Sequence, residues 1–162
     1  MNLADERLKE LGNPSLTADA RALLRCKEAA DLVHRGQYEA AREALGELWR
    51  GVGERPDVEG LEDGTAAEVL LQTGVLSGWI GASRQMQGAQ ETAKDLISES
   101  AALFKSLDLP ERSAVAQCEL TLCYWREGAY DEARTLLTDA FEWLRDPAEK
   151  AKAIVKLSTV EF

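Results

Sequence analysis

One short pattern occurs three times along the chain and constrains the fold more than any other feature. A glycine is followed five residues later by an alanine, with an acidic residue between them, at 36–41, 88–93 and 128–133. An aliphatic residue lies four positions beyond each alanine: Leu45, Ile97 and Leu137. Agreement that extends past the shared pattern predicts a protein built from repeated structural units.

Each copy of the pattern has the residue types of a turn between two helices. Glycine adopts the left-handed conformation that ends many helices because it has no Cβ atom. The acidic residue then falls in the first turn of the next helix, near the positive end of its dipole. After Gly128, apolar residues recur at spacings of three and four, which predicts one buried helix face: Ala133, Leu136, Leu137, Ala140, Phe141 and Leu144.

Helices are also expected before each glycine. The predicted spans are about 17–35, 65–87 and 111–127, with a further helix over 147–162. Pro110 and Pro147 stand at the starts of two of them, where a missing N–H costs nothing. A short helix over 3–11 would cap the first unit. No alternating run of β-branched residues indicates a strand, so the expected fold class is all-α.

The 162 residues are expected to form a single domain. Its parts are repeat 1 (about 17–50), an acidic loop (51–64), repeat 2 (65–107), repeat 3 (110–145) and an incomplete repeat 4 (147–162). For the loop, a solvated connector is a more natural interpretation than a segment that contacts a partner. Because repeat 4 has no second helix, we expect either a longer repeat protein or a helix that packs against another chain, as in a homodimer.

The units resemble the tetratricopeptide repeat (TPR). Leu120 and Tyr124, followed by Ala133, are similar to the family's L-G-x-x-Y…A-x-x-x-F pattern. Where the family prefers glycine, the three units carry Ala29, Gly81 and Thr121. The alanines are 52 and 40 residues apart, whereas TPR units repeat about every 34 residues; the longer spacing resembles repeats of bacterial signalling and regulator proteins. The resemblance implies a right-handed α-solenoid of antiparallel helix pairs.

The same resemblance implies a concave surface, lined by the first helix of each pair, that binds a partner. The partner-binding residues expected on this surface are Val33, His34, Gly78, Ala82, Arg84, Gln85, Met86, Cys118, Leu122, Trp125, Arg126 and Val155. Trp125 and Arg126 attract most attention because Trp and Arg are enriched in binding hot spots. The alternative is that Trp125 belongs to the core and that Arg126 is a solvated cation in the last helical turn.

Two further groups of residues, three glycines and two tryptophans, are better explained by packing than by binding. Gly74, Gly78 and Gly81 lie on one helix face, which predicts a close approach of another helix, although a ligand could use the same smooth face. Trp79 and Trp143 are interpreted as packing residues.

Residues that could carry catalysis are scarce. The chain has one histidine and three cysteines. His34 precedes a helix-ending glycine, where a cation interacts well with the helix dipole, so a capping role explains it without catalysis. Cys26, Cys118 and Cys123 are interpreted as buried free thiols. We therefore expect no enzyme, no catalytic residues, no metal site and no cofactor.

The net charge of −10 argues against nucleic acid and anionic membranes as partners, since both are bound through clustered Lys and Arg. It favours a protein or peptide partner with a basic or neutral contact surface. The N-terminus lacks the apolar segment of a signal peptide, so a cytoplasmic location is expected. The predicted function is a protein–protein interaction scaffold in bacterial signalling or regulation, with small-molecule sensing by a larger regulator as the alternative.

Overall fold

The computed structural model describes residues 3–160, and within this span the chain is all-helical with no strand. The helices are α1 (Leu3–Leu11), α2 (Ala18–His34), α3 (Tyr38–Leu45), the short 3-10 helix η1 (Gly46–Leu48), α4 (Asp63–Ser83), α5 (Ala89–Ser106), α6 (Pro110–Arg126), α7 (Tyr130–Phe141) and α8 (Pro147–Val160). The last two residues of the predicted helix over 147–162 lie outside the described residues. No helix in the described span is long and apolar enough to cross a membrane.

Local signals account for most helix boundaries. The side-chain oxygen of Thr17 accepts a hydrogen bond from the N–H of Ala20 and caps α2, which satisfies one of the free donors of the first turn. Pro110 and Pro147 are the first residues of α6 and α8, as predicted. The predicted cap helix over 3–11 is also present as α1, and it packs on α2.

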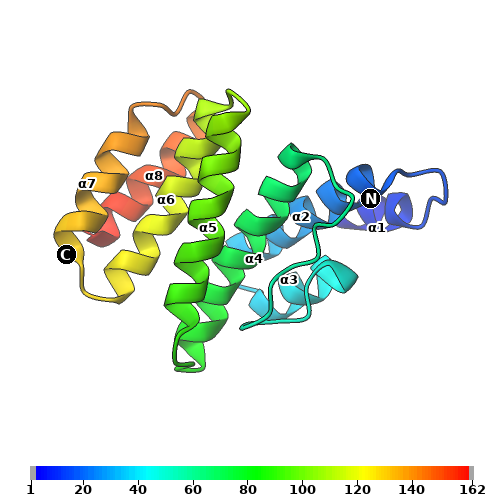
Figure 1. Ribbon diagram of the computed structural model, residues 1–162, viewed down its shortest axis with the longest axis horizontal. Helices are drawn as coiled ribbons and strands as arrows, with labels where there is room; N and C mark the ends of the chain where they lie inside the picture. The colour runs from blue at the N-terminus through cyan, green and yellow to red at the C-terminus, as the bar shows by residue number, and fades with distance from the viewer. Residues whose placement is uncertain (1–2, 161–162) are drawn as a thin grey trace.

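Helices that follow one another in sequence pack side by side along the molecule (Figure 1). Contacts also join α2 to α4, α4 to α6 and α6 to α8. We call α2, α4, α6 and α8 the first helices, because each begins one of the predicted units. The first helices therefore form a continuous row that crosses the repeat boundaries.

Two apolar clusters lie on either side of α4. One joins α2, α3 and the loop between η1 and α4 to α4 itself, around Leu45, Trp49 and Leu76. The other joins α4 to the helices that follow it, around Ile97 and Leu137. A central helix that packs on both sides must be apolar around most of its circumference. Fourteen of the 21 residues of α4 are buried.

The loop between η1 and α4 is exposed over most of its length, and it is also anchored to the first unit at several points. The indole N–H of the buried Trp49 donates to the carbonyl of Glu54 at 2.9 Å. The N–H of Asp57 donates to the carbonyl of Leu48 at 2.8 Å. The side chains of Val52 and Val58 pack against the first apolar cluster. These contacts hold the acidic loop against the end of the first unit.

The glycines of the repeated pattern do not all have the predicted role. Gly36 and Gly128 have positive φ and follow α2 and α6, as expected. In the second unit, however, α4 ends four residues earlier than predicted, and Gln85, with φ 52°, occupies the left-handed position. Gly88 instead precedes the first residue of α5. The helix-ending hydrogen bond here runs from Met86 N–H to Gly81 carbonyl at 2.8 Å.

This shift changes the register of the second unit by three residues. Seven residues before each left-handed residue lie Ala29, Gly78 and Thr121. All three are buried. Gly78 therefore stands where the sequence comparison placed Gly81. A Cβ atom at Gly78 would lie 3.6 Å from the Cβ of Ala93 on α5, so the position lies at a close approach of two helices.

Candidate functional site

The glycines of α4 show why α4 and α5 pack so closely. A Cβ atom at Gly81 would lie 2.1 Å from the Cβ of Ala89, and one at Gly74 would lie 2.6 Å from Cγ1 of Ile97. Both distances are far shorter than a van der Waals contact. At these two positions the packing interpretation is confirmed, because α5 occupies the space that a side chain would need.

Gly78 has a different neighbour, the guanidinium of Arg126. A Cβ atom at Gly78 would lie 2.8 Å from Nη1 of Arg126. The guanidinium carbon lies 4.3 Å from the centroid of the Trp79 ring, a favourable cation–π geometry. The Trp79 ring also stacks on Tyr38, with the ring centroids 5.1 Å apart and the planes inclined by 11°. We call Tyr38, Trp79 and Arg126 the Trp79 stack; it joins α3, α4 and α6.

A glutamine on α5 completes the surroundings of Arg126. Nη1 of Arg126 donates to Oε1 of Gln90 at 3.4 Å, and Nε2 of Gln90 donates to the carbonyl of Gly78 at 2.8 Å. Nη2 of Arg126 is buried and has no hydrogen-bond partner. Burial lowers the pKa of Arg126 from its ordinary value. The stack thus contains a buried cationic donor that the described part of the chain leaves unsatisfied.

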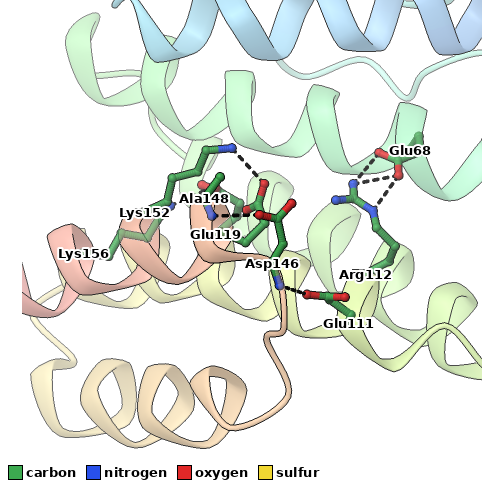
Figure 2. Close-up of polar contacts among 9 residues, drawn as sticks. Glu68, Glu111, Arg112, Glu119, Asp146, Ala148, Lys152 and Lys156 are labelled. Atoms are coloured by element: carbon green, nitrogen blue, oxygen red, sulfur yellow. Dashed lines mark hydrogen bonds and ion pairs between the residues drawn. The ribbon is translucent and has the colours of Figure 1, made fainter.

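Two ion pairs join neighbouring first helices to one another. Arg112 of α6 makes a two-pronged contact with Glu68 of α4, at 2.8 and 2.7 Å. Lys156 of α8 lies 3.0 Å from the carboxylate of Glu119 on α6. Figure 2 shows both contacts between neighbouring first helices. Burial alone would lower the pKa of Lys156, but the nearby Glu119 carboxylate raises it overall. These side chains hold the helices together and are not free for a partner.

The structure distributes the predicted partner-binding residues over three environments. The exposed ones are His34, Ala82, Arg84, Gln85, Met86 and Val155. The partly exposed ones are Val33, Trp125 and Arg126. The buried ones are Gly78, Cys118 and Leu122. Only the first two groups present side chains to a partner, because the first helices turn the third group toward the core.

Two exposed members of the set have local roles. Arg84 forms an ion pair with Glu39 of α3, and Gln85 ends α4 in the left-handed conformation. Arg126 is not the solvated cation of the alternative interpretation, because its guanidinium packs on Trp79 and over Gly78.

The cysteines are free and buried, as predicted. Desolvation raises the pKa of Cys26 and of Cys118 to about 12, and that of Cys123 to about 11. A thiol with so high a pKa remains protonated near neutral pH and is a poor nucleophile. Within the described residues, no three side chains of His, Cys, Asp or Glu gather to hold a metal ion.

Two open clefts lie beside turns between helices. One, of about 550 Å³, is lined by residues around the α2–α3 turn, including Tyr38 of the Trp79 stack, and by Ile80 and Ser83. The other, of about 520 Å³, lies between the α5–α6 turn and the α7–α8 loop and includes Trp143. Trp143 is 57% exposed, so its interpretation as a packing residue is wrong. The position of Trp143 just after α7, next to a charged loop, is the sequence feature that could have indicated its exposure.

No protein-family model, curated protein or solved structure matches this chain.

Proposed function

We propose that α2–α8 form a TPR-like right-handed solenoid of antiparallel helix pairs, with the first helices along its concave face. Two observations support this proposal. Small or buried residues recur seven positions before each left-handed turn residue, at Ala29, Gly78 and Thr121. The first helices also contact one another across the unit boundaries. In this arrangement the second helices lie on the outer side.

We further propose that the protein is a non-enzymatic, cytoplasmic interaction scaffold in bacterial signalling or regulation, which binds a partner segment in extended form on this face. The observation that carries the proposal is Nη2 of Arg126, a buried donor without an acceptor. An unsatisfied buried donor costs about 1–3 kcal/mol. Because Nη2 is enclosed in the free chain, a bound segment can recover part of that cost by drawing the guanidinium outward and offering it a carbonyl oxygen.

The surroundings of Arg126 suit a neutral contact with an extended chain. Ala82 lies one helical turn beyond Gly78 and is exposed, so a main chain could approach α4 closely there. Met86, also exposed, offers an adaptable apolar contact at the end of α4. The net charge of −10 favours partners with basic residues outside this contact, and it predicts association rates that fall as salt rises.

Small-molecule sensing, the alternative, has less support at the place where we expected it. A ligand beside Gly78 and Gly81 would need space that Arg126 and Ala89 occupy. We therefore base the test on a peptide segment.

The test uses peptides selected from a displayed random library against the whole protein. Selected peptides should bind Arg126→Glu at least about tenfold more weakly than wild type, as expected for a hot-spot residue. Arg134→Glu, an equal change of charge on an exposed position of α7, should bind as wild type does.

A second pair of variants avoids the buried stack. Ala82→Gln places a neutral side chain over the proposed contact, whereas Ala102→Gln makes the same change on an exposed position of α5. Only Ala82→Gln should weaken binding, with unchanged circular dichroism in both variants. Failure of any peptide to be enriched, or equal binding by wild type, Arg126→Glu and Ala82→Gln, would contradict the proposal.

A further inference from the structure

A second surface lies where the α5–α6 turn faces the α7–α8 loop. The cleft there measures about 520 Å³, within the range of about 300–1,000 Å³ in which ligand-binding clefts fall. Its apolar lining consists of Leu109, Pro110, Val115 and Trp143. Leu109 is 42% exposed and Trp143 is 57% exposed. A large aromatic and a leucine are therefore accessible together in one depression, as in the anchor pockets of interfaces.

Hydrogen bonds within the chain hold the walls of this cleft in place. Oε1 of Glu111 on α6 accepts the backbone N–H groups of Arg145 and Asp146, at 2.5 and 2.7 Å. Oδ1 of Asp146 in turn accepts the N–H of Ala148 at 2.8 Å and caps α8. Figure 2 shows how Glu111 ties the loop before α8 to the start of α6. The cleft is thus preorganised rather than a gap between mobile segments.

The charge around the cleft is predominantly negative. Four carboxylates line it, those of Asp108, Glu111, Asp146 and Glu149, against the guanidiniums of Arg112 and Arg145. Two of these groups already have partners outside the lining: Arg112 makes its two-pronged contact with Glu68, and Glu149 pairs with Lys152 at 2.8 Å. Asp108, Glu111 and Asp146 then face the single guanidinium of Arg145. The cleft therefore offers an apolar floor with an acidic margin.

We propose that this cleft is a docking site for a basic side chain, arginine or lysine, carried between aliphatic residues of a partner segment. The aliphatic stem would lie on Leu109 and Trp143, because basic side chains bury their stems while keeping the charge in a polar setting. The cation would lie over the Trp143 ring, an arrangement that is attractive in exposed sites, with Asp108 and Asp146 as counter-ions. This inference does not depend on the proposed role of Arg126, since the two surfaces share no residue.

The choice of a basic occupant follows from charge complementarity. An acidic occupant would be repelled by the carboxylates of Asp108 and Asp146, and a purely apolar one would bury these two carboxylates without providing a counter-ion. A chain with net charge −10 also attracts basic segments from a distance, which raises the rate of encounter.

The probes are three acetylated peptides with the central sequence Leu-X-Leu, in which X is arginine, norleucine or glutamate. Norleucine keeps the aliphatic stem but removes the charge. Binding to the whole ¹⁵N-labelled protein is followed through the indole N–H signals of its four tryptophans. The arginine peptide should shift the Trp143 signal in a saturable manner and bind at least about fivefold more tightly than the norleucine peptide. The glutamate peptide should cause no saturable shift.

Pairs of matched variants test whether the arginine peptide binds in this cleft. Trp143→Ala should weaken binding of the arginine peptide at least about fivefold, whereas Tyr130→Ala, which removes an equally exposed aromatic residue of α7, should leave it unchanged. Asp108→Asn keeps a side chain that tolerates the left-handed backbone, and it should weaken binding relative to Asp139→Asn on the exposed side of α7. Arg126→Glu should not change the affinity for this peptide.

Three outcomes would overturn the inference. Equal affinity for the arginine and norleucine peptides would show that charge plays no part. Unchanged affinity of Trp143→Ala would place the binding elsewhere. Concentration-dependent dimerisation that Trp143→Ala abolishes, without binding of the arginine peptide, would identify a second copy of the chain as the occupant.

Discussion

The guanidinium of Arg126 lies 4.3 Å above the ring of Trp79, and this contact joins the third unit of the chain to the second. Gly78 leaves room for the guanidinium, since a Cβ atom there would lie 2.8 Å from Nη1 of Arg126. Tyr38 extends the stack to the first unit. One cation and two aromatic rings therefore connect three units at the point where the partner surface is proposed.

The two glycines next to Trp79 should respond differently to alanine. Gly81→Ala should lower the free energy of unfolding by about 1–3 kcal/mol, the usual cost of overpacking, because its Cβ would meet the Cβ of Ala89 at 2.1 Å. Gly78→Ala should change it by less than about 1 kcal/mol, since the flexible end of Arg126 can move and alanine favours helix. Chemical denaturation measures both. Equal losses would show that α5 does not approach Gly81 more rigidly than Arg126 approaches Gly78.

Gln85 has a strained backbone conformation that glycine would adopt without strain. Its φ of 52° lies in the left-handed region, which costs other L-residues about 1–2 kcal/mol. Gln85→Gly should therefore stabilise the protein by about 0.5 kcal/mol or more, after subtraction of the larger chain entropy of glycine in the unfolded state. Gln87→Gly, on the same connection but without a positive φ, should destabilise slightly. A lower melting temperature for Gln85→Gly would refute this expectation.

Glu111 should make the loop before α8 sensitive to acid. Its hydrogen bonds with the N–H groups of Asp146 and Arg145 lower the pKa of Glu111 below the ordinary glutamate value. A carboxylate with a lowered pKa in the folded state contributes stability above its unfolded pKa of about 4.3, and this contribution is lost as pH falls through the lower folded value. Glu111→Gln should therefore melt earlier than wild type at neutral pH, and the difference should disappear in acid.

The matched control for this titration is Glu132→Gln on the exposed face of α7. It removes one carboxylate without touching the loop before α8. A pH-independent gap between wild type and Glu111→Gln would mean that the hydrogen bonds do not depend on the charge of the carboxylate.

The three thiols should react only when the chain opens. Burial raises the pKa of Cys26 and of Cys118 to about 12 and that of Cys123 to about 11, so almost no thiolate is present at pH 8. Ellman's reagent should modify the native protein slowly and the guanidinium-unfolded protein at once, at three thiols per chain. Rapid modification of one thiol in the native state would show that its helix opens locally.

Local signals in the sequence located most of the helix boundaries. Prolines at the starts of α6 and α8, and glycines with positive φ after α2 and α6, agree with the structure. These features act through the conformational preferences of single residues and their neighbours. Because their effect is local, they can be recognised in the sequence without the structure.

The second unit shows where such signals fail. Gly88 resembles Gly36 and Gly128 in its sequence context, yet Gln85 ends α4. The local preference of Gly88 for a left-handed backbone is satisfied before α5 instead. The helices α4 and α5 approach closely at Gly74 and Gly81, and no residue near Gln85 indicates in the sequence that α4 ends there.

Two tryptophans show which features follow from the sequence alone and which depend on the tertiary structure. Trp49 and Trp143 both follow amphipathic helical stretches, but Trp49 is 2% exposed and Trp143 is 57% exposed. The acidic loop folds over Trp49 and accepts its indole N–H through Glu54, whereas a charged cleft surrounds Trp143. The sequence by itself determined the all-helical class, the caps and most turns, because these depend on residues close along the chain. Only the tertiary structure decided the register of the second unit, the burial of Arg126 and the exposure of Trp143, because each depends on atoms brought together from different helices.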